Sequence, residues 1–146
     1  MYPDAIIQAV RMLGAPYLWN AKWPVGTYPV SRDSPIDCSG FSRWILSLAD
    51  ITIPDGSFNQ IKVCTKLPAS QQSAPPCLTL GFYQPQDTVD HVVVSCGGGV
   101  VIEAHGSKVL TPGVPSDCVV LRTVDSWLKV PGFLGFYAPP GLSTQD

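Results

Sequence analysis

One cysteine and two histidines are the side chains of this chain best suited to covalent chemistry. Cys38 directly follows Asp37. The histidines are His91 and His105, and Glu103 lies two residues before the second of them. A thiolate that attacks a carbonyl needs an imidazole as its base, and the imidazole needs a third polar group to hold its tautomer and orientation. The chain supplies all three residue types, so the sequence indicates a cysteine nucleophile with an imidazole partner.

A helix is predicted to begin at Cys38 and to end near Asp50. Pro35 and Asp37 stand where helix-start signals belong. The apolar residues that follow recur at helical spacing: Phe41, Trp44, Ile45 and Leu48. A thiol in the first turn of a helix faces oriented backbone N–H groups and the positive end of the helix dipole, which favour the thiolate. Because the thiolate is the nucleophilic form, this position suits Cys38 to attack.

A hairpin is predicted to bring the polar residues together. Strand-like runs span residues 78–83, 91–96, 100–105, 119–124 and 133–138. Gly97-Gly98-Gly99 joins the second and third runs, as a tight hairpin requires. Such a hairpin would put His91 and residues 103–105 at the same end of two paired strands. Glu103 and His105 are two residues apart and would leave the same face of the sheet.

The order of the elements predicts an α+β fold. A first helix is expected over residues 3–13 and a short one over 57–64, with irregular chain between residues 15 and 36. Helices first and strands later indicate helices packed on one face of an antiparallel sheet, here of about five strands.

Length and composition describe a packed globular domain. The chain is 45% apolar and only 14% charged. Its 146 residues suit one domain, 1–146, with a surface loop over 67–76 and a C-terminal tail over 139–146. A net charge of −2 without a Lys/Arg run speaks against nucleic acid as a partner. No apolar run approaches the ~20 residues of a membrane span, so we expect no membrane insertion.

The five cysteines follow no metal-binding spacing. They are odd in number and contain no C-x-x-C pair, so no metal site is expected. A disulfide between Cys64 and Cys77 stays open, although buried, reduced thiols are the simpler interpretation because free cysteine often packs as a small hydrophobe. Residue types alone also leave open that Cys38, His91 and His105 are ordinary core residues.

Several segments resemble, in order, the NlpC family of bacterial cell-wall cysteine peptidases, a papain-like branch. Residues 14–19 are similar to its G-x-P-Y-x-W-G motif, and residues 37–41 match D-C-S-G-[FL]. Residues 53–60 resemble its lPR-x-S-x-x-Q stretch, and residues 91–104 its H-V-G-I-Y-x-G-x-G-x-x-I-[HE]-A hairpin. The shared order and spacing of these segments carry the resemblance.

The resemblance implies roles for the reactive residues. Cys38 matches the nucleophile and His91 the general base. The third polar residue of the family lies twelve positions after the base, which here is Glu103; many members have histidine there, so His105 is a rival. We favour Glu103, because a carboxylate that accepts the imidazole N–H orients the ring and stabilises the imidazolium.

Three further residues are expected near the nucleophile. Tyr17 matches the tyrosine whose phenol approaches the nucleophile in the family, where it would help the Cys38 backbone N–H bind the developing oxyanion. A packing aromatic is the alternative for Tyr17. Asp37 and Ser39 are expected to shape the helix start and the site and to take no part in the chemistry.

The chain also departs from the family pattern. The region before the histidine strand, residues 78–86, lacks the aspartate of the usual P-G-D-L motif. Val93 stands where a glycine usually follows the base, Asn20 replaces the second glycine of the first motif, and residues 23–35 form a long insertion. These changes leave the Cys–His pair intact. They leave undecided the shape of the substrate groove and therefore the identity of the substrate.

The resemblance implies a papain-like peptidoglycan hydrolase. It would act as an endopeptidase or amidase on stem peptides, with the γ-D-glutamyl to diamino-acid bond as the first candidate, through a thioester acyl-enzyme and without a cofactor. Two alternatives stay open. One is a papain-like acyltransferase or other amidase, and the other is a non-catalytic module that binds cell-wall fragments through the aromatic-rich residues 17–28.

The start of the chain bears on where the protein is expected to act. Residues 1–4 show no basic n-region and no apolar h-region follows, so no signal peptide is expected. Together with the resemblance, this suggests a phage or prophage product that acts on the bacterial cell wall, as a lysin or a tail peptidase. A toxin delivered between bacteria is the alternative, and the sequence does not indicate an oligomeric state.

Overall fold

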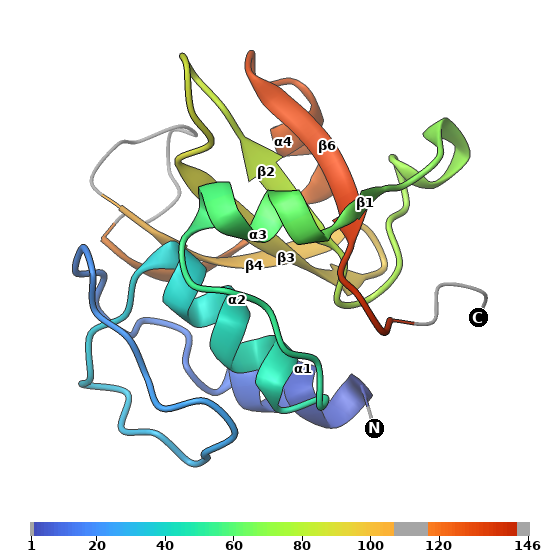
Figure 1. Ribbon diagram of the computed structural model, residues 1–146. Helices are drawn as coiled ribbons and strands as arrows, with labels where there is room; N and C mark the ends of the chain where they lie inside the picture. The colour runs from blue at the N-terminus through green and yellow to red at the C-terminus, as the bar shows by residue number, and fades with distance from the viewer. Residues whose placement is uncertain (1, 107–116, 143–146) are drawn as a thin grey trace.

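A computed structural model of the chain describes residues 2–106 and 117–142 (Figure 1). Its helices are α1 (Tyr2–Val10), α2 (Cys38–Ser47), α3 (Ser57–Val63), the short 3-10 helix η1 (Ala69–Gln71) and α4 (Val124–Leu128). Its strands are β1 (Thr65–Lys66), β2 (Leu80–Tyr83), β3 (His91–Gly97), β4 (Val100–His105), β5 (Cys118–Thr123) and β6 (Phe133–Ala138). None of the helices in these residues is long and apolar enough to span a bilayer.

The strands form one antiparallel sheet, and the α+β class predicted from the sequence is confirmed. Its strand order is β1-β6-β2-β3-β4-β5, six strands where about five were predicted. The additional strand is β1, which is two residues long and therefore too short to give an alternating pattern. Strand β2 begins at Leu80, two residues later than predicted, because Leu78 adopts a positive φ of 69° that takes the chain out of the extended conformation.

The β3–β4 hairpin forms at the glycine triplet, as predicted. All three glycines have positive φ, 80°, 64° and 81° for Gly97, Gly98 and Gly99, a conformation that side-chain-bearing residues seldom adopt. Val94 pairs with Ile102 across the hairpin. The first residue of β3, His91, and the last residue of β4, His105, therefore lie at the same end of the sheet.

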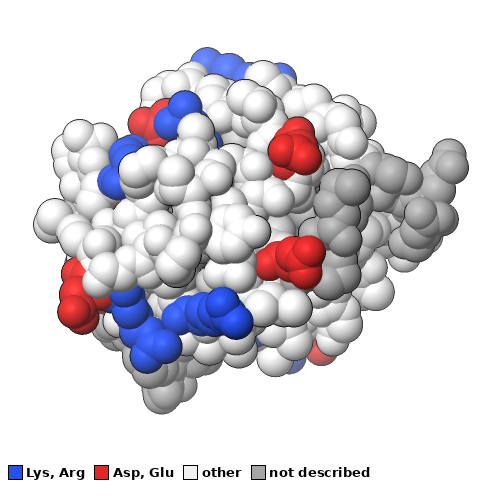
Figure 2. Space-filling view, turned by 90° about the horizontal axis from the view of Figure 1, so that it is seen from below, with Lys and Arg blue, Asp and Glu red and all other residues white. Residues whose placement is uncertain are grey.

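Helices α1 and α2 lie together on one face of the sheet (Figure 1). Helix α2 packs on β3 and β4. The core on this face includes Phe41, Trp44 and Ile45 of α2 and the alternate strand residues Val92, Val94, Ile102 and Ala104. Helix α2 ends at Ser47 and not near Asp50, where the chain turns with a positive φ of 60°. The view onto this side of the molecule shows charged side chains scattered among uncharged ones (Figure 2).

The opposite face carries a second apolar cluster and a helix that the sequence did not predict. Helix α4 places Val124 and Trp127 in a cluster with Leu67, Val93, Val101 and Phe136. The expectation of helices on one face only is therefore wrong. Strand β5 stops at Thr123, whose side chain accepts the Ser126 N–H at 3.1 Å and caps α4. With five residues, α4 is too short to show helical periodicity.

The predicted loop over 67–76 is tied to the sheet more closely than its composition indicates. It contains η1, and the Gln72 side-chain amide donates to the carbonyl oxygens of Leu67 and Phe136 at 3.0 Å each. Of the predicted tail over 139–146, residues 143–146 lie outside the described residues. All five cysteines are free thiols, so Cys64 and Cys77 form no disulfide.

Candidate active site

Cys38 is the first residue of α2 and lies beside the start of β3. Its Sγ is 3.9 Å from the carbonyl oxygen of Asp90, the residue before His91. Cys38 thus lies in the first turn of the helix, at the positive end of the helix dipole. This is the environment that the sequence predicted for the thiol.

Asp37 holds the start of α2 in place. Its Oδ1 accepts the Gly40 N–H at 2.7 Å as the helix cap, and its Oδ2 accepts the Asn20 N–H at 3.1 Å. A Cβ at Gly40 would lie 2.8 Å from Asp37 Oδ1 and 3.0 Å from the Ala21 carbonyl oxygen, so only glycine fits there. Asp37, which directly precedes Cys38, therefore shapes the site through the helix cap.

Lys22 was not singled out by the sequence, although it joins this cap to the rest of the site. Its Nζ lies 2.6 Å from Asp37 Oδ2, 2.8 Å from Asp55 Oδ1 and 3.1 Å from Ser39 Oγ. Burial acts to lower the pKa of Lys22, but hydrogen bonds to Asp37 and Asp55 outweigh it and raise the pKa. The ammonium group is thus a fixed positive charge between two carboxylates.

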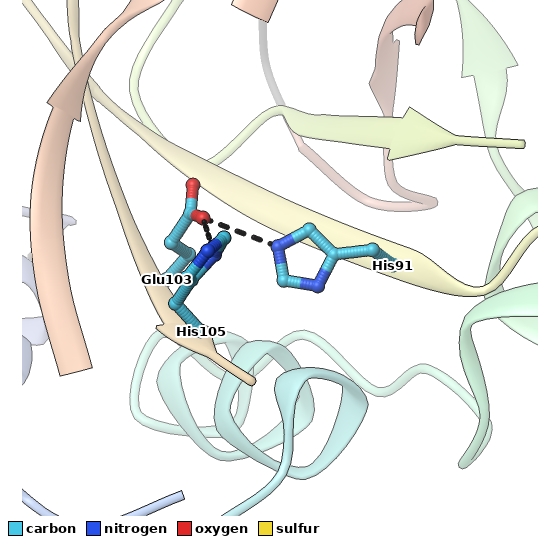
Figure 3. Close-up of side chains that lie close together, drawn as sticks. All are labelled: His91, Glu103 and His105. Carbon is cyan, nitrogen blue, oxygen red and sulfur yellow. Dashed lines mark hydrogen bonds and ion pairs between the residues drawn. The ribbon is translucent and has the colours of Figure 1, made fainter. Parts of the chain in front are cut away.

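His91, Glu103 and His105 form one buried cluster, as the hairpin predicted (Figure 3). Glu103 Oε1 is 3.2 Å from His91 Nε2 and 2.8 Å from His105 Nδ1. The two imidazoles stand edge to face, with ring centroids 5.8 Å apart. The carboxylate therefore lies between the histidines, and His105 contacts Glu103 directly.

Interactions within this cluster lower the pKa of Glu103 and raise the pKa of His91. Burial acts to raise the pKa of Glu103, but hydrogen bonds from His105, His91 and Trp127 and the charge of His91 lower it to about 2. Burial acts to lower the pKa of His91, but hydrogen bonds and charge interactions with Cys38 and Glu103 raise it to about 10. Since Nε2 of His91 is directed at Glu103, Nδ1 is the ring nitrogen left for Cys38.

Trp127 and Arg122 complete the surroundings of the carboxylate, and the sequence pointed to neither. Trp127 Nε1 donates to Glu103 Oε2 at 2.6 Å, and the indole stacks on the His91 ring with centroids 5.4 Å apart. Arg122 lies with its Cζ 4.5 Å from the centre of the indole ring and its NH1 3.6 Å from Glu103 Oε1. Both side chains are buried.

Tyr17 lines the same groove as Cys38. Its backbone is fixed by a bridge to Ile36 and by a hydrogen bond from its N–H to the Asp117 carbonyl oxygen at 2.7 Å. Burial, followed by the negative charges of Cys38, Asp37 and Asp90, raises the pKa of Tyr17 to about 12. The phenol therefore keeps its proton at neutral pH and can donate a hydrogen bond into the groove.

The groove beside Cys38 has a volume of about 450 Å³. Its walls come from residues 17–22, from the start of α2, from residues 55–59 and from residues 89–90. Two of the lining aromatic side chains are largely exposed: Trp19 is 79% exposed and Phe58 is 51% exposed. The groove that Cys38 lines therefore has exposed aromatic side chains at its rim.

His91, Glu103 and His105 also bring three potential metal ligands within 4.8 Å of one another. Glu103 Oε1 is already directed at both imidazoles, and the Arg122 guanidinium lies 3.6 Å from it. A fixed positive charge at that distance opposes a second cation. The three side chains are therefore better placed to hydrogen-bond with one another than to bind a metal ion.

Comparison with known proteins gives a family match over most of the chain. The model of the NlpC/P60 family matches residues 14–125. The chain is 29% identical over 102 residues to the probable endopeptidase p60 of Listeria grayi, a match that covers 70% of this chain and 18% of that protein. It is 30% identical over 104 residues to the probable endopeptidase p60 of Listeria seeligeri, with 71% and 18% covered. The chain spans under a fifth of the length of these curated relatives.

Solved structures share the fold. The P60 domain of an antigen from M. avium subspecies paratuberculosis superposes with a TM-score of 0.67 at 24% identity, covering 94% of this chain and 93% of that one. The peptidoglycan hydrolase RipB from Mycobacterium tuberculosis gives 0.67 at 24% identity, with 94% and 63% covered. RipD from the same organism, described as a non-catalytic NlpC/p60 domain protein adapted to peptidoglycan binding, gives 0.67 at 20% identity, with 96% and 98% covered.

Proposed function

The chain belongs to the NlpC/P60 family, and we propose that it is a cysteine peptidase that hydrolyses amide bonds in the stem peptides of peptidoglycan. One observation carries the proposal. Cys38 stands at the start of α2 beside His91, and the far side of the His91 ring is directed at the buried Glu103 carboxylate. This is the order of nucleophile, base and orienting group that cysteine peptidases need.

The proposed reaction begins from a thiolate–imidazolium pair. The Cys38 thiolate attacks the peptide carbonyl, and the His91 imidazolium gives its proton to the leaving amine. The Cys38 backbone N–H and the Tyr17 phenol stabilise the developing oxyanion. His91, now neutral, takes a proton from water, which attacks the thioester and releases the acid. Throughout, Glu103 keeps the imidazole oriented and balances its charge.

The first candidate bond is the γ-D-glutamyl to diamino-acid bond. The exposed Trp19 and Phe58 line the groove and are proposed to contact the substrate, whereas the insertion over residues 23–35 is not among the lining residues. The bond is therefore to be established by experiment on peptidoglycans of defined composition.

The test compares the wild-type protein with Cys38→Ala and with Cys64→Ala, which removes a free thiol outside the groove. Each is incubated with peptidoglycans of defined stem peptide, and released fragments are identified by mass spectrometry. We expect new amine and acid termini from the wild type and from Cys64→Ala, and none from Cys38→Ala. Fragments from Cys38→Ala at the wild-type rate would refute the proposal. Binding without cleavage by all three would support a binding module, the description given to RipD.

Two other expectations stay proposals. We propose that residues 1–146 form one domain, and that the protein acts on the bacterial cell wall. Acyl transfer in place of hydrolysis would appear, when an amine is added to the same incubation, as a fragment joined to that amine. Phage or prophage origin stays a prediction, which neighbouring genes for holin or tail proteins would support.

A further inference from the structure

Trp127 contacts two members of the His91–Glu103–His105 cluster at once. Its Nε1–H donates to Glu103 Oε2 at 2.6 Å. Its ring stacks on the His91 imidazole, with centroids 5.4 Å apart and planes inclined by 28°. The side chain is fully buried. A buried indole N–H needs an acceptor, and here the acceptor is the carboxylate that also bonds His91 and His105.

The two oxygens of the Glu103 carboxylate have separate partners. Oε1 accepts from the imidazoles of His91 and His105, whereas Oε2 accepts from Trp127. A carboxylate with only one oxygen bonded can rotate about its terminal bond and present either oxygen to the base. Because the indole holds Oε2, Oε1 stays directed at His91 Nε2.

We propose that Trp127 is a positioning residue, whose indole N–H fixes the Glu103 carboxylate and whose ring covers the His91 imidazole, so that the imidazolium facing Cys38 is held in place. The inference rests on the proposed function, in which Cys38 and His91 are the reactive pair. The indole also excludes water from the His91–Glu103 hydrogen bond, and its π face stabilises a neighbouring cation.

Trp127 is itself fixed by elements that set the geometry of the site. The Val124 N–H, at the start of α4, donates to the Gly99 carbonyl oxygen in the β3–β4 turn at 2.8 Å. The Arg122 guanidinium lies over the indole, with its Cζ 4.5 Å from the ring centre. The hairpin that brings His91 and Glu103 together thus also anchors the helix that carries Trp127.

The charged and titratable groups around His91 come from four elements. Tyr83 of β2 is its cross-strand partner and lies with its ring centroid 5.5 Å from that of Trp127. Cys38 faces it from α2, and Glu103 and His105 face it from β4. Arg122 of β5 lies behind the carboxylate, 3.6 Å from Oε1. Trp127 carries no charge, so any change in the titration of His91 on its replacement reports orientation and shielding.

The experiment replaces Trp127 in two ways. Trp127→Phe removes the N–H and part of the ring, and site-specific replacement by β-(3-benzothienyl)alanine keeps the shape and removes only the donor. Trp44→Phe is the matched control, because Trp44 is also a buried tryptophan and its indole N–H bond of 2.7 Å to the Thr27 carbonyl oxygen lies away from the cluster. The chain has only two histidines, so ring-proton NMR follows the titration of His91 directly.

With either Trp127 replacement we expect the pKa of His91 to fall by roughly one unit, the usual effect of a weakened charge-assisted hydrogen bond. We expect kcat on peptidoglycan fragments to fall about 10- to 100-fold, the usual loss when a side chain that orients a reactive group loses its own hydrogen bond. KM should change little. Trp44→Phe should show neither change. In a Glu103→Gln background, the β-(3-benzothienyl)alanine replacement should lower the His91 pKa no further, because it removes only the donor to a carboxylate that is already gone.

Two outcomes would overturn the inference. One is a His91 titration that stays at the wild-type pKa in both Trp127 replacements. The other is a full additional fall in the pKa when the β-(3-benzothienyl)alanine replacement is combined with Glu103→Gln. A failure of the proposed function is distinguishable, since a wild-type protein that cleaves no peptidoglycan still allows the His91 titration to test the role of Trp127.

Discussion

Glu103 and His105 are joined by a hydrogen bond of 2.8 Å between the carboxylate Oε1 and the imidazole Nδ1. The same oxygen lies 3.2 Å from Nε2 of His91. His105 is therefore hydrogen-bonded to the Glu103 carboxylate, which in turn is hydrogen-bonded to His91. This order favours Glu103 over His105 as the third member of the proposed catalytic set.

We expect Glu103→Gln to lower kcat on the order of 10²- to 10⁴-fold, because an amide does not balance the imidazolium charge and can favour the wrong tautomer. His105→Gln should cost about tenfold or less, since a glutamine can still donate to the carboxylate. The measurement is kcat on purified stem-peptide fragments. A larger loss from His105→Gln than from Glu103→Gln would make His105 the third catalytic residue.

Stability should be greatest between about pH 4.5 and 6.5. Folding lowers the pKa of Glu103 from 4.5 to about 2, so its contribution is present above pH 4.5 and is lost as the pH falls toward 2. Folding raises the pKa of His91 from 6.5 to about 10, so its contribution is present below pH 6.5 and is lost as the pH rises toward 10. Urea unfolding across this range measures both slopes.

Glu103→Gln is the variant that separates the two slopes. It should abolish the acid slope and reduce the alkaline one, because the carboxylate is one of the two partners that raise the pKa of His91. Glu103 is the only glutamate of the chain, so a ¹³C-labelled glutamate reports its ionisation without overlap. A carboxyl resonance that titrates near pH 4.5 in the folded protein would contradict the expected shift.

The five free thiols should differ sharply in reactivity. Burial raises the pKa of Cys64 to about 12; burial, with the charge of Cys77, raises that of Cys96 to about 12. Burial also raises the pKa of Cys77, and burial with the charge of Asp117 raises that of Cys118. Iodoacetamide at pH 6 should therefore modify Cys38 first, as peptide mapping would measure. Equal rates at Cys38 and Cys118 would argue against a thiolate–imidazolium pair.

The cap of α2 should contribute to stability and to the site together. We expect Asp37→Ala to lower the free energy of unfolding by about 1–2 kcal/mol, because the Gly40 N–H loses its acceptor. Asp37→Asn keeps an acceptor and loses only the charge opposite Lys22, so its effect should be smaller. Chemical denaturation measures both.

Gln72→Ala is the control for lost stability, because it removes the side-chain hydrogen bonds to Leu67 and Phe136 without touching α2 or α4. It should lower stability by a similar amount and leave the alkylation rate of Cys38 unchanged, whereas Asp37→Ala should lower that rate. An unchanged alkylation rate in Asp37→Ala would show that the cap serves stability alone.

The sequence predicted the elements that depend on interactions between residues close together in the chain. The spacing of Phe41, Trp44 and Ile45 predicted α2, and the glycine triplet predicted the hairpin that joins His91 to Glu103. Both signals depend on residues a few positions apart, so a single chain displays them directly.

The sequence did not predict the site residues that depend on contacts between distant segments or on very short elements. Trp127 lies 24 positions after its partner Glu103, on a helix of five residues that shows no periodicity. Lys22 lies 15 positions before Asp37 in irregular chain. Such contacts arise from the packing of α4 and of residues 15–36 on the sheet, which no local pattern encodes.

Trp19 should contribute to substrate binding and not to chemistry. It is 79% exposed at the groove that contains Cys38, and exposed aromatic side chains at such rims supply contact area to a ligand. We expect Trp19→Ala to raise KM roughly tenfold with kcat unchanged, the sign of binding made equally in ground and transition states. Tyr28→Ala is the matched control, since Tyr28 is 59% exposed in the same irregular segment but is not among the groove's lining residues. Steady-state kinetics on stem-peptide fragments would decide, and equal effects of the two substitutions on KM would show that the groove rim has no special part in binding.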